Sequence, residues 1–146
     1  MKNFNITDDK EVNIDLFDID ELELNKAKSY IVNSNQVTSN CYSQDYLQYF
    51  LNNDRRYSLI IGNPPYIKKT NLEESQIKVC QEVHQRVKEY SNEINSKGNI
   101  KNIWTAFVES AIMSLEDDGI VCYVIPAEIL QVKYAKELRA SIVSEF

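Results

Sequence analysis

A short apolar run that stops at two consecutive prolines constrains this chain more than any other feature of its sequence. Residues 57–62 read YSLIIG, a run rich in β-forming residues, and Asn63, Pro64, Pro65 and Tyr66 follow without a break. Proline fixes its own φ, lacks a backbone donor and holds the preceding residue in extended geometry. The chain therefore leaves this strand as a stiff turn, called here the proline corner (residues 63–66), whose carbonyls are held outward.

Strand-like and helix-like segments alternate along the rest of the 146 residues. Strands are expected at 12–17, 37–41, 57–62 and 119–125, and helices at 21–33, 44–53, 72–94, 103–119 and 133–146. The consecutive apolar residues 59–61 predict a strand that is buried on both faces of a parallel sheet. The expected fold class is α/β, with a mainly parallel sheet, flanking helices and one core.

The composition argues against several classes of function. Net charge is −6, so bulk electrostatic binding of nucleic acid is not expected, although Arg55, Arg56, Lys68 and Lys69 flank the proline corner. Three widely spaced cysteines and one histidine do not make a zinc site. No apolar run approaches the roughly 20 residues of a membrane span, and the polar, acidic N-terminus is unlike a signal peptide. We therefore expect a cytoplasmic protein with no metal site and no membrane span.

Polar residues follow three of the expected strands, at the end where open parallel sheets bind their ligands. Asp18 and Asp20 follow the first strand, Asp45 follows the second, and the proline corner follows the third. If these strands are neighbours, the three groups converge at one edge. A carboxylate in such a place can hold the two hydroxyls of a ribose, but each of these acids can equally cap the helix that follows it.

The proline corner suits a planar amino group. Such a group donates two hydrogen bonds, and it fits between the side-chain carbonyl of Asn63 and the backbone carbonyl of Pro64. Accepting both bonds draws the nitrogen away from planarity, so that its lone pair can attack a methyl donor. The ring of Tyr66 offers a face for a base to stack on, worth ~1–3 kcal/mol. The simpler interpretation is a turn that ends a strand.

At this point the sequence resembles a known family. The segment LIIGNPPYI resembles the signature of amino-group methyltransferases that use S-adenosylmethionine. The wider pattern is similar to the N6-adenine-specific DNA methyltransferases of restriction-modification systems. LFDID at 16–20 resembles that family's ribose-binding motif, and SQDYL at 43–47 resembles the motif that contacts the adenine of the cofactor. Residues 97–115, 117–130 and 134–142 are similar to the family's later segments.

The resemblance implies a partial Rossmann-like fold of the S-adenosylmethionine-dependent methyltransferases. It implies catalytic roles for Asn63, Pro64, Pro65 and Tyr66. The cofactor contacts that it implies are Asp18, Ile19, Asp45 and Tyr46. The substrate that it implies is double-stranded DNA, from which the target adenine is flipped because a paired amino group cannot reach a methyl donor.

The chain departs from the family at its glycine-rich motif, which would precede Asp18 and cradle the methionine part of the cofactor. The three glycines, at positions 62, 98 and 119, form no such loop. We therefore expect residues 1–146 to be a single partial catalytic domain of a larger enzyme, without that motif and without a target-recognition domain. Alone, the chain is expected to be inactive, to lack half of the cofactor site and to self-associate, and to reach DNA only through the complete enzyme.

Two alternatives stay open. Protein glutamine methyltransferases and some RNA guanine methyltransferases have similar corners, although the segment NIWTAFVESAI at 102–112 looks more like the DNA enzymes. The other alternative is a non-catalytic module for folding or interaction, which the missing glycine motif favours. Trp104 is expected in the core rather than in a cofactor pocket.

Overall fold

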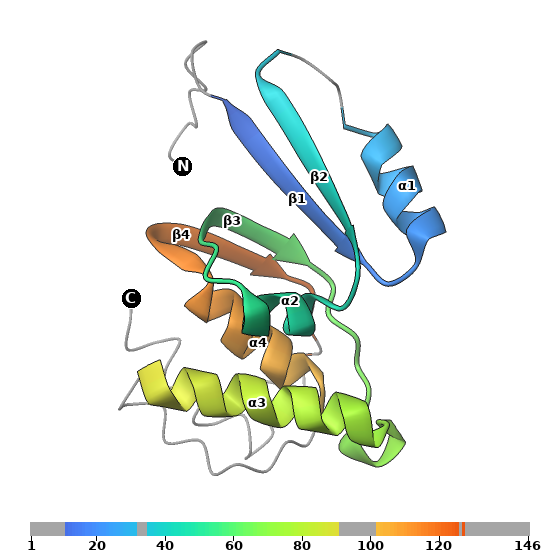
Figure 1. The fold of residues 1–146 in the computed structure, drawn as a ribbon, viewed down its shortest axis with the longest axis vertical. Helices are drawn as coiled ribbons and strands as arrows, with labels where there is room; N and C mark the ends of the chain where they lie inside the picture. The colour runs from blue at the N-terminus through green and yellow to red at the C-terminus, as the bar shows by residue number, and fades with distance from the viewer. Residues whose placement is uncertain (1–10, 32–34, 91–101, 126, 128–146) are drawn as a thin grey trace. The chain divides into compact units, whose positions relative to one another are not determined.

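The computed structural model describes residues 11–31, 35–90, 102–125 and 127, which fall into two compact units, Met1–Tyr46 and Leu47–Phe146 (Figure 1). The helix expected at 133–146 lies outside the described residues. So do the last residues of the helix expected at 72–94.

The first unit is a strand, a helix and a parallel strand. β1 (Val12–Asp18) and β2 (Val37–Ser43) form a two-stranded parallel sheet, and α1 (Glu21–Ser29) connects them. Both predicted strands are confirmed, and α1 packs on the pair through Leu24, which is buried. α1 ends earlier than predicted, because the backbone N–H of Tyr30 bonds the carbonyl three residues back (3.2 Å) and closes the last turn.

The second unit pairs two further parallel strands and covers them with helices. Its elements are α2 (Tyr46–Asn52, beginning at the last residue of the first unit), β3 (Tyr57–Gly62), the 3₁₀ helix η1 (Lys69–Asn71), α3 (Glu74–Tyr90), α4 (Trp104–Met113) and β4 (Leu115–Tyr123). β3 pairs in parallel with β4, and α4 lies between this pair and α3 (Figure 1). Parallel pairs joined through helices confirm the expected α/β class.

The core of the second unit lies along α4. Trp104 is only 1% exposed and packs with Val108, and the half-buried residues Ile112, Tyr123 and Ile125 pack against them. α3 contributes Cys80, Val83 and Val87, all fully buried. The core position expected for Trp104 is confirmed.

The boundary between α4 and β4 differs from the prediction. The helix expected at 103–119 ends at Met113, and Gly119 lies within β4 rather than at a helix end. Leu115 already pairs with Tyr57, and the next matched pair is Leu59 with Ile120, so residues 116–119 form a bulge in the ladder. The three acidic residues 116–118, which precede Gly119, therefore lie in an irregular part of the strand.

The prediction that β3 is buried on both faces was wrong. Leu59 is 51% exposed and Ile61 is 73% exposed. Among the described residues β3 has β4 as its partner strand, and the helical core covers the face of this pair that carries Tyr123. The alternation of exposed and half-buried residues along both strands follows from this one-sided covering.

Candidate active site

The proline corner begins where β3 ends. The backbone N–H of Val124 donates to the carbonyl of Gly62 (3.0 Å), so the sheet ladder holds the chain up to the residue before the corner. Pro64 is buried, whereas Asn63 is exposed and Tyr66 keeps 45% of its surface in solvent. The corner therefore anchors itself through one proline and presents its amide and its aromatic ring to solvent.

The hydroxyl of Tyr66 lies against two oxygen atoms. It lies 2.7 Å from Asn63 Oδ1, and it also lies within hydrogen-bond distance of the carbonyl oxygen of Val124. Asn63 follows β3 and Val124 follows β4, so the hydroxyl joins the ends of two paired strands. This contact holds the ring of Tyr66 close to the amide of Asn63.

The segment after the corner is attached to the start of α4. The N–H of Ile103 donates to the carbonyl of Ile67 (3.0 Å), and Lys68 and Asn102 form an antiparallel bridge. Asn102 is 9% exposed and leads directly into the buried Trp104. The corner is thus fixed on both sides, by the end of β4 before it and by the two residues that precede α4 after it.

Gly62 allows a close approach at the entrance to the corner. A Cβ atom at this position would lie 2.9 Å from Cε1 of the Tyr123 ring. Tyr123 in turn packs on the core around Trp104. The glycine therefore lets β3 and β4 keep the spacing that positions the corner above the core.

In the first unit, the predicted acids lie together at the carboxyl ends of the strands. Asp18 pairs in register with Ser43, and Asp45 follows two residues later. Oδ1 of Asp20 accepts hydrogen bonds from the backbone of Leu22 (2.8 Å) and from the next residue, so Asp20 is the N-cap of α1. The capping interpretation therefore holds for Asp20.

Asp18 is exposed at the end of β1, and its Oδ1 accepts a hydrogen bond from the backbone N–H of Asp20 (2.8 Å). Ile19 projects into solvent with 79% of its surface exposed. The ring of Tyr46 packs edge-on against Phe17, with ring centres 5.3 Å apart. Asp18, Ile19, Asp45 and Tyr46 therefore gather around one end of the first unit.

The strand neighbourhood expected from the sequence is found only in part. β1 and β2 are neighbours, which brings the two predicted groups of acids together. Within the described part of the chain, β3 is paired with β4 and belongs to the other unit. The residues predicted to contact the cofactor and the residues of the corner thus form two separate clusters, one in each unit.

Two of the four basic residues that flank the corner in sequence lie at the opposite end of β3. Arg56 donates to the carbonyls of Met113 and, at 3.2 Å, of Leu115, and so caps the end of α4. Arg55 lies over the ring of Tyr57 (5.8 Å to its centre). The six residues of β3 separate this end from the corner, about 20 Å at the usual rise of a strand. Arg55 and Arg56 therefore flank the corner in sequence but do not lie beside it in the structure.

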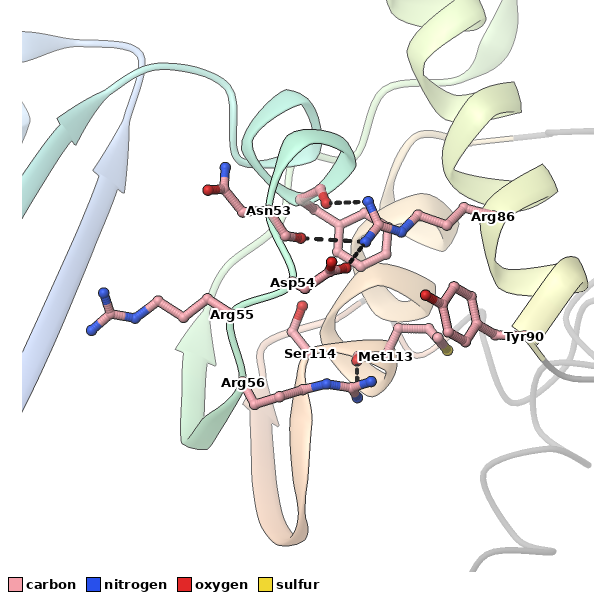
Figure 2. Close-up of a pocket in the computed structure, with 9 residues that line it drawn as sticks. Asn53, Asp54, Arg55, Arg56, Arg86, Tyr90, Met113 and Ser114 are labelled. Carbon is pink, nitrogen blue, oxygen red and sulfur yellow. Dashed lines mark hydrogen bonds and ion pairs between the residues drawn. The ribbon is translucent and has the colours of Figure 1, made fainter.

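Arg55 and Arg56 line a small cavity, and Arg86 lines it as well (Figure 2). Arg86 donates to the carbonyls of Phe50 and Leu51, both at 2.8 Å, and forms an ion pair with Asp54. Figure 2 shows its guanidinium turned toward the end of α2, whereas Arg55 points away from the cavity. The volume is about 10 Å³, room for a single water molecule. Two of the arginines around this cavity therefore cap helices: Arg86 caps the end of α2 and Arg56 caps the end of α4.

Two further features are absent from the described residues. No three His, Cys, Asp or Glu side chains come close enough there to ligate a metal ion. None of the helices there combines the length and the apolar character that a membrane span requires.

Two groups that hold the corner could not be predicted from the sequence. One is the backbone carbonyl of Val124, and the other is the buried Asn102. A carbonyl carries no residue-type signal, and asparagine is common in loops. The expected strand at 119–125 was the available hint, because its end must lie near the end of a strand that pairs with it.

Known proteins are similar to this chain over almost its whole length. Residues 2–146 match the family described as the Eco57I restriction-modification methylase. The chain is also 30% identical over 139 residues to the type II methyltransferase M.AccI of Acinetobacter calcoaceticus. That alignment covers 94% of this chain and 23% of M.AccI, so the chain spans less than a quarter of its relative's length. The chain belongs to the Eco57I restriction-modification methylase family.

Proposed function

We propose that this chain is part of a DNA methyltransferase that transfers a methyl group from S-adenosylmethionine to the N6 amino group of adenine in double-stranded DNA. The observation that carries this proposal is the proline corner, which presents an exposed Asn63 and a half-exposed Tyr66 at the carboxyl end of β3. The family match and the similarity to a type II methyltransferase favour DNA as the substrate.

In this proposal, the corner binds the amino group through its acceptors. Asn63 Oδ1 accepts one N–H bond and the backbone carbonyl of Pro64 accepts the other. Burial of Pro64 and the fixed φ of both prolines keep the backbone carbonyl of Pro64 in place before the substrate arrives, and the contact with the Tyr66 hydroxyl restrains the side chain of Asn63. Because the acceptors are preorganised, they stabilise the positive charge that grows on the nitrogen during attack without reorganising.

The ring of Tyr66 stacks on the adenine after the base has left the duplex. Unpairing and unstacking cost a few kcal/mol, and a stacking surface recovers part of that cost. Tyr66 suits this task because its hydroxyl is held near the corner while its ring stays half-exposed. Pro65, exposed beside it, keeps the turn rigid.

The residues at the end of the first unit fit part of a nucleoside-containing cofactor. The carboxylate of Asp18 can accept hydrogen bonds from ribose hydroxyls, and the exposed side chain of Ile19 offers an apolar surface for a flat base. Asp45 and Tyr46 lie at the same end, with Tyr46 fixed by its packing on Phe17. When bound, S-adenosylmethionine supplies an electrophilic methyl group on its sulfonium sulfur.

The proposal extends to the complete protein. Residues 1–146 are one part of a larger catalytic domain, whose glycine-rich motif and target-recognition domain lie in other parts of the protein. The 23% coverage of M.AccI supports this view. Contacts with DNA outside the flipped base, including sequence recognition, are assigned to those other parts. A cytoplasmic location is also part of the proposal.

The test is Asn63→Ala in the complete methyltransferase, assayed with tritiated S-adenosylmethionine and unmethylated DNA. We expect methyl transfer to fall by at least about 100-fold, because one preorganised acceptor is lost. The melting temperature should not change, since Asn63 is exposed. The matched control is Asn52→Ala, which removes an exposed amide at the end of α2 and should keep full activity.

The same assay separates the alternatives. Retention of most activity by Asn63→Ala would contradict the role of the corner. Transfer of label to RNA or to a protein glutamine, with none to DNA, would support the other amino-group methyltransferases. A complete protein that neither binds S-adenosylmethionine nor transfers methyl groups would support a non-catalytic module.

A further inference from the structure

The hydroxyl of Tyr66 makes contacts that ring stacking does not require. It lies 2.7 Å from Asn63 Oδ1 and within hydrogen-bond distance of the carbonyl oxygen of Val124. The two residues that it contacts follow two different strands, β3 and β4. A phenylalanine would stack on a base equally well, so the hydroxyl calls for a separate explanation.

Proton counting limits what this arrangement can be. A phenol hydroxyl carries one proton, and the carbonyl of Val124 can only accept. With Asn63 Oδ1 also facing the hydroxyl, two acceptors compete for one donor. A 180° turn of the Asn63 amide removes the conflict, because oxygen and nitrogen exchange places with almost no change of shape. Asn63 Nδ2 then donates to Tyr66, and Tyr66 donates to Val124.

We propose that the Tyr66 hydroxyl is a positioning group that orients the Asn63 amide through this chain of hydrogen bonds. The backbone N–H of Val124 donates to the carbonyl of Gly62 (3.0 Å), so the sheet holds Val124 in place, and the carbonyl of Val124 accepts the hydrogen bond of the phenol. The tyrosine oxygen then accepts from Nδ2 of Asn63. The amide oxygen is thereby turned away from the tyrosine and is held as the acceptor for the amino group of the substrate.

This inference rests on the proposed function, because the amide matters only if Asn63 accepts from a substrate amino group. It divides Tyr66 into two parts with different roles. The ring binds the flipped base, and the hydroxyl sets the amide. Loss of the ring should therefore affect base binding, whereas loss of the hydroxyl alone should affect the rate of transfer from the bound state.

The experiment compares Tyr66→Phe and Tyr66→Ala with the unaltered complete methyltransferase. Single-turnover methyl transfer reports the chemical step. Base flipping is followed by the fluorescence of 2-aminopurine at the adenine that the unaltered enzyme methylates, since this analogue carries its amino group at another ring position. Tyr30→Phe is the matched control, because Tyr30 is 85% exposed at the far end of α1 from Asp18.

We expect Tyr66→Phe to transfer methyl groups about tenfold more slowly, the loss that one misplaced hydrogen bond brings. Its KM for DNA and its 2-aminopurine signal should match those of the unaltered enzyme. Tyr66→Ala should lose the signal as well as the rate, and Tyr30→Phe should lose neither.

Three results would overturn the inference. A Tyr66→Phe enzyme that is as fast as the unaltered one, or faster, would mean that the hydroxyl is idle or competes with the substrate for Asn63. Equal loss of flipping in Tyr66→Phe and Tyr66→Ala would mean that the hydroxyl only supports the fold of the corner. If the unaltered enzyme methylates no adenine, the proposed function fails and this inference fails with it.

Discussion

Single residues decide how closely the two strands of the second unit can approach each other. Gly119 lies in the bulge of β4, where an added Cβ would lie 3.0 Å from the carbonyl oxygens of both Glu116 and Tyr57. Gly62 differs, because all three of its nearest neighbours would be atoms of the Tyr123 ring, the first at 2.9 Å. Backbone atoms cannot give way as a ring can, so Gly119 is the more restricted position.

We predict that Gly119→Ala lowers the free energy of unfolding by about 1–3 kcal/mol, the range typical of overpacking. Gly62→Ala should cost less stability, because the Tyr123 ring can shift, but it should reduce methyl transfer in the complete enzyme by moving the start of the proline corner. Urea unfolding of both variants measures the first effect. Equal stability of Gly119→Ala and the unaltered chain would contradict the steric argument.

At the scale of elements, a buried polar contact joins the two long helices of the second unit. Nδ1 of His84 on α3 lies 3.2 Å from Oε1 of Glu109 on α4, and the two side chains are 14% and 9% exposed. Apolar packing on both sides surrounds this contact. Because the corner is attached to the start of α4, the contact between these helices also supports the site.

We predict that His84→Leu destabilises the chain by about 1–3 kcal/mol, because the buried carboxylate of Glu109 loses a partner. The control is Lys78→Leu, which breaks the exposed pair of Lys78 with Glu82 (3.8 Å) on the same helix. That pair should contribute no more than about 1 kcal/mol. Thermal or urea unfolding compares the two variants, and equal losses would show that burial of the pair is not what matters.

At the scale of the whole molecule, one face of the β3–β4 pair carries several exposed apolar residues. Its exposed apolar residues are Leu59 (51%), Ile61 (73%), Ile120 (44%) and Val124 (66%). Parallel strands ordinarily have both faces covered. A continuous apolar surface of this kind drives association unless another part of a protein covers it.

We therefore predict that the 146-residue chain on its own self-associates at micromolar concentrations. The double variant Ile61→Lys, Ile120→Lys should shift the chain toward the monomer, because it places two charges on this face. Sedimentation equilibrium measures the shift. The control variant Ile19→Lys alters a residue of the first unit that is 79% exposed, and an equal effect of this control would contradict the role of the β3–β4 face.

The sequence by itself determined the local structure and the chemical character of the corner. Strand propensity and two prolines predicted β3 and its rigid exit at residues 63–66, and apolar spacing predicted the helices and the α/β class. These features depend on neighbouring residues, so a local pattern contains them.

Tertiary structure alone decided the rest. Tyr66 meets a carbonyl 58 residues away, Arg56 caps the end of α4, and residues 116–119 bulge out of a strand. Such contacts arise from the packing of segments that are distant in sequence, and hydrogen bonds to backbone atoms leave no mark in residue type.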